Sequence, residues 1–389
     1  NILCFVAFCA GISMRVMDAL IPRLSGEFGI AINEASDTVT YFGFAYGASL
    51  LAIGVLGDRY GKMVVVAHGC VVSAIATLAC ALAPDFEWLR IARLCSGAAN
   101  SALMTLAMAW IGDVVPYQAR QASLSRLLVG MSLGVTCGIF LGGFAAEASF
   151  GWRHVFAVLS VLYLAGGLML LSMRGKLPPI ALRRSPVTHS LLGGALDDYR
   201  QVLRQRRALV IFIIVCLEGA LYFGALAFIP YHLQATHGIS LSLAGSIVML
   251  TGVGGLVFSL FAPVLLRLGE RLLVLAGGGL AAGGLATIGA AAPLVYAVPA
   301  AFCAGLGFYM LHSTLQTNAT QLVSERRGAA MAAFSASFFL GQAVGVSALG
   351  MLLLYRGSGP AMLGAAFGLF AVSVAMSAAV GSRRDLSAG

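Results

Sequence analysis

Six ionisable side chains interrupt the apolar stretches of this 389-residue sequence, and their chemistry needs an explanation. A charged group in an apolar environment costs free energy unless it is paired or hydrated, so such a residue indicates a functional site. Guanidinium groups bind anions, whereas carboxyl and imidazole groups take up and release protons. The candidates for proton coupling or substrate binding are Arg15, Asp18, Arg93, Arg126, Glu218 and His312.

Glu218 is the sharpest candidate for a proton carrier. Its apolar run, residues 208–231, contains no Lys or Arg. Desolvation favours the neutral form of a lone carboxyl group, so Glu218 is expected to exchange a proton. The alternative is that Glu218 stays protonated and hydrogen-bonds permanently to a neighbouring helix. His312 is either a proton relay or substrate contact, or the partner in an ordinary interhelical hydrogen bond.

The three arginine residues also have structural interpretations. Arg15 and Asp18 are three positions apart, which places them on one face of a helix where they can pair with each other. Arg93 could extend its long side chain to the membrane interface, in which case a lysine would serve equally well. For Arg126 the sequence leaves open whether the side chain faces a cavity or the interface.

The elements that position these residues are predicted to be membrane-spanning helices. Hydrophobic residues make up 60% of the sequence, charged residues 10%, and the mean hydropathy is +0.93, which excludes a soluble globular domain. The uncharged stretch 272–324 must fold back near Ala291 to form two spans. Twelve helices are predicted, near residues 2–22, 38–57, 63–83, 88–112, 122–146, 153–173, 208–231, 242–266, 272–291, 295–318, 328–354 and 360–381.

Basic residues orient these helices. Most Lys and Arg residues fall in the even-numbered connections and the C-terminal tail, including eight in the segment 174–207. The positive-inside rule then predicts a multi-pass protein of the bacterial inner membrane with both termini in the cytoplasm. The first apolar run lacks a basic start and a small-residue cleavage site, so a helix is expected there and not a signal peptide. The segment 174–207 is predicted to be a cytoplasmic linker that touches anionic lipid.

An internal repeat relates the two halves of the chain. Because the shift corresponds to six helices, an even number, both halves have the same topology and form parallel repeats. The predicted fold is an all-α membrane protein with two pseudo-symmetric six-helix bundles, residues 1–173 and 208–389. A shift of 207–208 residues superimposes landmarks of one half on the other, among them Gly47 on Gly255, Gly61 on Gly269 and Arg120 on Arg327.

A charged turn between the second and third predicted helices carries the most specific motif, Gly54-Val-Leu-Gly-Asp58-Arg59-Tyr-Gly61-Lys62. This pattern resembles the signature loop of the major facilitator superfamily of secondary transporters. The resemblance implies that Asp58 docks on the second half, where a helix begins near Gly328, and latches the cytoplasmic side shut. Asp113 and Arg120 match other positions of this latch. The alternative is a solvated turn that merely obeys the positive-inside rule.

Two further motifs resemble this family. Leu89, Arg93, Gly97 and Asn100 match its fourth-helix motif, whose Arg is linked to proton coupling. A stripe of glycine residues resembles the family's antiporter motif, although Ile139 replaces the proline of that motif; pure helix packing is the alternative. The glycine residues of the stripe are Gly130, Gly134, Gly138, Gly142 and Gly143.

The resemblance covers essentially the whole chain and is closest to the twelve-helix drug and sugar efflux branch. It implies a proton-coupled transporter that exports a small organic or drug-like molecule by alternating access. Proton-coupled import of a small organic acid or sugar is the alternative, and a non-transporting membrane receptor is a weaker one. The expected partners of the monomeric chain are a small-molecule substrate, protons and membrane lipid, without nucleic acid. The sequence contains no Walker A sequence, no catalytic motif and no paired Cys spacing. We therefore expect that the protein is not an enzyme and has no cofactor or metal site.

Overall fold

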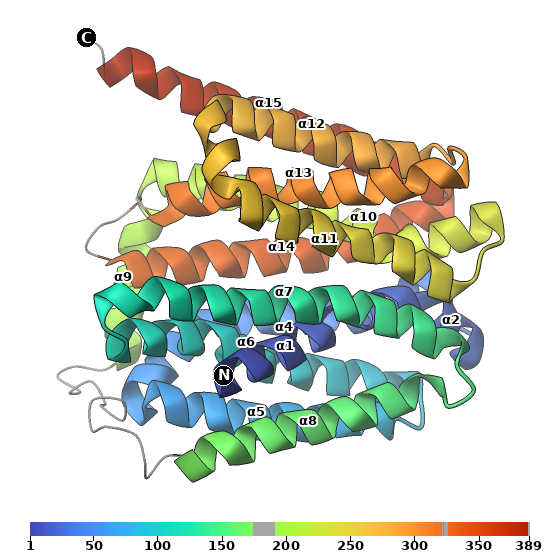
Figure 1. The fold of residues 1–389 in the computed structure, drawn as a ribbon, viewed down its shortest axis with the longest axis horizontal. Coiled ribbons are helices and arrows are strands. Elements are labelled where there is room, and N and C mark those ends of the chain that lie inside the picture. Colours follow the sequence, from blue (N-terminus) through green and yellow to red (C-terminus); the bar gives the residue numbers. More distant parts are fainter. Residues whose placement is uncertain (174–190, 321, 323–325, 388–389) are drawn as a thin grey trace.

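The computed structural model describes residues 1–173, 191–320, 322 and 326–387, which form helices and no strand. Twelve helices of this described part are long and apolar enough to cross a membrane. They run roughly parallel to one another as two packed groups, one from each half of the chain (Figure 1). The predicted all-α class and number of spans are therefore confirmed.

The first half contributes six spans. The first of them, Ile2–Phe28, is interrupted: α1 (Ile2–Arg15) is followed by a 3-10 turn, Asp18–Leu20, and by α2 (Ile21–Phe28). This span is longer than the predicted 2–22, because Pro22 occupies the first turn of α2, where a helix does not need its missing N–H. The remaining elements are α3 (Ile32–Ala35), α4 (Asp37–Tyr60), α5 (Lys62–Ala81), α6 (Phe86–Val114), α7 (Tyr117–Glu147) and α8 (Gly151–Met173).

The second half follows a short helix, α9 (Leu191–Leu203), which lies within the predicted linker. Residues 174–190 of that linker lie outside the described part of the chain. The predicted turn at Ala291 is confirmed, since this residue has a φ of 52° between two helices. The spanning elements are α10 (Arg206–His237), α11 (Leu241–Leu265) with a 3-10 extension (Leu266–Leu268), α12 (Glu270–Gly289), α13 (Leu294–Thr320), α14 (Arg327–Arg356) and α15 (Ser358–Ser387).

Equivalent helices make equivalent contacts in the two halves. Helix α1 packs against α7 as α10 packs against α14, and α5 packs against α8 as α12 packs against α15. The halves meet where α4 contacts α14 and where α7 contacts α11. This pairing is the one expected for parallel repeats, and it places the 3-10 turn that follows α1 against α10.

The glycine stripe of α7 allows a close approach to α1. A Cβ atom at Gly134 would lie 2.1 Å from the carbonyl oxygen of Phe8, which no side chain tolerates. Gly143 differs from the others because it faces the carbonyl oxygen of Leu241 in α11, across the boundary between the halves. Packing is therefore the contribution of the stripe in this conformation. The other glycine residues that face the α1 backbone are Gly130, Gly138 and Gly142.

The two ends of the molecule carry different groups. We refer to the end with Lys62 and α9 as the basic end, and to the end with Glu147 as the opposite end. At the basic end, the hydroxyl group of Tyr199 in α9 donates to the carbonyl oxygen of Leu51 in α4 at 2.9 Å. On its other side, α9 is joined to Arg326 at the start of α14 by an ion pair from Asp198 (2.5 Å). Helix α9 therefore contacts both halves of the chain.

Candidate transport site

Arg15 and Asp18 lie at the interruption of the first span, where α1 gives way to the 3-10 turn. They form the ion pair that their spacing predicted, with 3.3 Å between Arg15 Nη1 and Asp18 Oδ2, and both are buried. Arg15 also reaches the second half of the chain. Its Nη2 donates to Gln342 Oε1 at 3.1 Å, and its guanidinium carbon lies 3.8 Å from the centre of the Phe223 ring. The buried charge thus connects the two halves.

Arg93 is completely buried inside the first half and does not extend to the membrane interface. Its Nε donates to the carbonyl oxygen of Thr38 and its Nη1 to that of Ser13, each at 3.1 Å. The guanidinium group also lies over the Phe42 ring, 4.1 Å from its centre. Arg93 therefore joins α6 to both α1 and α4, and it interacts electrostatically with Asp18.

Glu218 and His312 form a pair that sequence analysis treated as two separate candidates. His312 Nδ1 lies 2.9 Å from Glu218 Oε2, which links α10 to α13. Glu218 is completely buried, and its second oxygen, Oε1, has no hydrogen-bond partner among the described residues. The His312 ring stacks on Phe308. A carboxyl group paired with imidazole in this way can accept a proton and pass it on.

Aromatic rings surround this pair. Phe223, which lies under the Arg15 guanidinium group, contacts both Phe308 and Phe338 edge to face. The ring of Tyr46 in α4 packs against Phe339 in α14 at 4.2 Å, so aromatic contacts also cross between the halves. These residues give the middle of the molecule flat apolar walls beside a few buried charges.

Arg126 lies apart from this group. Its side chain is exposed near the basic end of α7, where it borders a cavity of about 710 Å³ formed by α1, α6, α7 and neighbouring helices. The structure thus brings together five of the six ionisable candidates and separates Arg126 from them. Gln342, by contrast, was missed. The repeat offered a signal for it, because the equivalent position in the first half is the apolar Val135.

The loop at the basic end holds its charges within the first half in this conformation. Lys62 Nζ lies 2.5 Å from Asp113 Oδ2 and 3.5 Å from Asp58 Oδ1. Gly61 adopts a φ of 94°, which only glycine does readily, and this explains its place in the motif. Asp58 therefore pairs with Lys62 here, whereas the resemblance implies docking on the second half. Of the remaining latch candidates, Arg59 lies over the Tyr60 ring, and Arg120 donates to the Val115 carbonyl oxygen. A Cβ atom at Gly54 would meet no other atom within 4 Å.

We expect Asp58→Asn to slow transport while leaving equilibrium substrate binding within a few-fold of the wild-type value. The reason is that Asp58 lies at the basic end, away from Arg15 and Glu218, so it acts on the exchange between conformations. Transport rates in proteoliposomes and binding in detergent would be compared, with the exposed Asp197→Asn of α9 as the control. Normal transport by Asp58→Asn would refute a latch role.

A carboxylate at the opposite end joins the two halves, and sequence analysis did not single it out. Glu147, the last residue of α7, accepts hydrogen bonds from the backbone N–H and hydroxyl groups that begin α11. Its Oε1 lies 2.6 Å from Leu241 N, and its Oε2 lies 2.6 Å from Ser242 Oγ. A negative charge at a helix N-terminus is stabilised by the unpaired N–H groups and the helix dipole.

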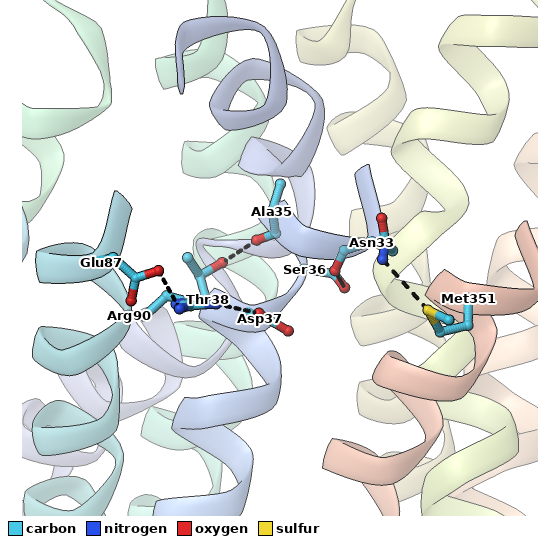
Figure 2. A network of polar contacts seen from close by, with 8 residues as sticks. All are labelled: Asn33, Ala35, Ser36, Asp37, Thr38, Glu87, Arg90 and Met351. Carbon is cyan, nitrogen blue, oxygen red and sulfur yellow. Dashed lines mark hydrogen bonds and ion pairs between the residues drawn. The ribbon is translucent and has the colours of Figure 1, made fainter. Parts of the chain in front are cut away.

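Further contacts at the opposite end are shown in Figure 2. Arg90 of α6 pairs with Asp37 of α4 (2.9 Å) and with Glu87. Asn33 of α3 approaches the sulfur of Met351 in α14 at 3.6 Å, which is a second contact between the halves. This contact and the hydrogen bonds of Glu147 join the two halves at the opposite end.

We expect Glu147→Ala to open the opposite end, because it removes the hydrogen bonds that Glu147 accepts from Leu241 and Ser242 and the negative charge at the start of α11, a loss of about 1 kcal/mol for the closed state. The measurement is labelling of an Ile139→Cys reporter, buried near Gly245 of α11, by a membrane-impermeant thiol reagent. Labelling should be faster in the Glu147→Ala background. The control is Glu87→Ala, which removes an exposed acid that pairs within one half. Equal labelling in both backgrounds would contradict the role of Glu147.

Twelve spans in two repeats, with buried charges where the repeats meet, are the architecture of a multi-pass secondary transporter. The sequence profile of the Major Facilitator Superfamily matches residues 3–346. The chain belongs to this superfamily, and it is a transporter and not an enzyme.

Similar proteins agree with this assignment. An uncharacterized MFS-type transporter of Bacillus subtilis, YceJ, is 24% identical over 89% of this chain and 87% of its own length. The multi-drug resistance efflux pump PmrA of Streptococcus pneumoniae is 27% identical over 50% of each chain. The crystal structure of the nucleoside transporter NupG superimposes with a TM-score of 0.77 at 17% identity and covers 97% of both chains.

Proposed function

We propose that this protein is a proton-coupled secondary transporter that exports a small organic molecule by alternating access. The observation that carries the coupling is the Glu218–His312 pair. It lies among aromatic side chains, and its buried Glu218 has a carboxyl oxygen without a hydrogen-bond partner in the described part of the chain. Protonation of this pair changes its charge next to the place where the halves meet, and it thereby favours one conformation over another.

Alternating access is supported by the contacts between the halves. Glu147 and Asn33 join them at the opposite end, whereas the ion pairs of Asp58 and Asp113 stay within the first half at the basic end. We propose that the positively charged basic end faces the cytoplasm of a bacterium, with residues 1–173 and 208–389 moving as two units joined by a linker. The structure then represents a conformation that is closed on the outside.

Export is the proposed direction because the chain resembles the efflux branch and is similar to a multi-drug efflux pump. A second candidate is import of an organic acid together with a proton. It is favoured by Arg15 and Arg93, two buried cations that a negatively charged substrate would complement.

The test begins with growth of expressing and control cells on a panel of toxic compounds and metabolites. A compound that distinguishes the two cultures is then added to energised inverted membrane vesicles containing a pH-sensitive dye. Antiport predicts that protons leave the vesicles when substrate is added. Import with a proton predicts that substrate and protons cross the membrane in the same direction, so the proton gradient has the opposite effect on substrate uptake. Substrate movement that is independent of the proton gradient would refute the proposed coupling.

A further inference from the structure

We infer that the substrate is an organic monoanion whose carboxylate group binds Arg15 in place of the Gln342 side chain. This inference rests on the proposed transport function and names the chemistry of its substrate. It starts from an asymmetry in the contacts of Arg15. One side of the guanidinium group pairs with an acid, Asp18, whereas its hydrogen bond toward the second half goes to a neutral amide oxygen.

The amide of Gln342 occupies a position that suits a carboxylate oxygen better. Arg15 Nη2 donates to Gln342 Oε1 at 3.1 Å, a hydrogen bond to an uncharged acceptor. A carboxylate presents two oxygens to the planar guanidinium group, and charge-assisted hydrogen bonds of this kind are about twice as strong as neutral ones. Since Gln342 belongs to α14 of the second half, this contact must break when the halves separate at this level. An anion can then take the place of the amide.

The charges around Arg15 leave room for one anion. With Asp18 ionised in its ion pair with Arg15, the buried groups of the first half here are two cations, Arg15 and Arg93, and one anion. The hydrogen bonds of Arg93 go to the neutral carbonyl groups of Thr38 and Ser13, so its charge is not cancelled by them. A monoanion next to Arg15 balances this excess of one positive charge, and a cation would add to it.

The second half supplies one more acidic group, the Glu218–His312 pair, and its protonation determines the net charge of the site. The Glu218–His312 pair carries one negative charge when it holds no extra proton and is neutral when it holds one. Tyr222 interacts electrostatically with both Glu218 and Arg15, and so links this pair to the arginine. The site is then neutral when an anion binds together with the protonated pair, which corresponds to the second candidate function, import of an organic acid together with a proton.

Buried polar atoms without partners agree with an anion. Gln342 Nε2 and Arg93 Nη2 are both donors, and neither has an acceptor among the described residues. Asp18 Oδ1 and Glu218 Oε1 are unpartnered acceptors, but Asp18 already has Arg15, and protonation converts Glu218 into a donor. A carboxylate is an acceptor only, so it adds no further unpartnered donor to this site.

The body of the substrate is expected to be flat and apolar. Phe223 lies directly under the Arg15 guanidinium group, and Phe308 and Phe338 contact Phe223 edge to face. An aromatic ring attached to the carboxylate would meet these rings in the offset or edge-on geometries that aromatic groups prefer. The substrate class is thus an aromatic or similarly apolar monocarboxylate.

Three isosteric probes test the charge of the ligand: benzoate, the neutral benzamide and the cationic benzamidine. Binding to the purified full chain in detergent is measured by calorimetry and by the shift of the unfolding temperature. We expect benzoate to bind at least roughly tenfold more tightly than benzamide, the effect of one added charge-assisted hydrogen bond. Benzamidine should bind least. Equal responses to all three probes, including no response to any, would overturn the inference.

Gln342→Glu tests the position of the carboxylate, because it places a permanent one next to Arg15. Benzoate binding should be lost while the protein remains folded, since the introduced acid occupies the same guanidinium group. Gln316→Glu, an exposed position on α13, is the matched control and should bind benzoate as the wild type does. Undiminished benzoate binding by Gln342→Glu would refute the site. These assays need no gradient, so they fail independently of the proposed proton coupling.

Discussion

Glu218→Gln is expected to abolish transport against a gradient while leaving the protein folded. The amide has almost the shape of a protonated carboxyl group and can keep a hydrogen bond to His312, whose Nδ1 lies 2.9 Å from Glu218 Oε2. The amide cannot release a proton, so a transport cycle that requires deprotonation stops. Exchange of substrate across the membrane without a pH gradient needs no such release and should survive.

The measurement compares uphill transport and substrate exchange in the same proteoliposome preparation. Uphill transport should fall to background, and exchange should stay within a few-fold of the wild type. Glu87→Gln serves as the control, because Glu87 is an exposed acid that pairs with Arg90 at the opposite end. If Glu218→Gln still concentrates substrate, proton coupling belongs to another group, with Asp18 as the next candidate.

Arg93→Lys is expected to lower transport roughly tenfold or more, because at least one charged hydrogen bond of about 1.5–3 kcal/mol is lost. The planar guanidinium group reaches the carbonyl oxygens of Thr38 and Ser13, which belong to two different elements, at the same time. A lysine ammonium group is a compact charge and cannot reproduce this fork. We also expect a changed pH dependence of transport, since Arg93 interacts electrostatically with Asp18.

Arg90→Lys is the matched control for this experiment. Arg90 lies three residues away on α6, but its side chain is at the opposite end, where it pairs with Asp37 and Glu87 (Figure 2). A lysine can keep an ion pair there, so this variant should transport nearly as the wild type does. If Arg93→Lys has normal expression, kinetics and pH dependence, then Arg93 belongs to the scaffold alone.

The positions of the spans could be predicted because hydropathy is a local property. A run of about 20 apolar residues reports a membrane-spanning helix whatever it packs against. The fold-back at Ala291 followed in the same way from an uncharged stretch too long for one helix. The first span was harder, because its interruption between Arg15 and Ile21 depends on packing around a buried ion pair.

The pairing of site residues could not be predicted, because the partners come from distant helices. Glu218 and His312 are 94 residues apart, and Arg15 and Gln342 are 327 apart. Helical periodicity assigns a residue to a face of its own helix, but it does not report which face of another helix lies opposite. The same limit explains why Glu147 was missed, since its importance depends on where α11 begins.

The sequence by itself determined the twelve spans, the repeat of two halves and the ionisable residues within the apolar runs. All three follow from composition and spacing along one chain. The tertiary structure alone decided that Arg126 stands apart, that Arg93 binds two carbonyl groups inside the first half and that Arg15 reaches across to Gln342. The physical reason is that the cost of a buried charge depends on the partners within hydrogen-bond distance, and helix packing in three dimensions supplies those partners.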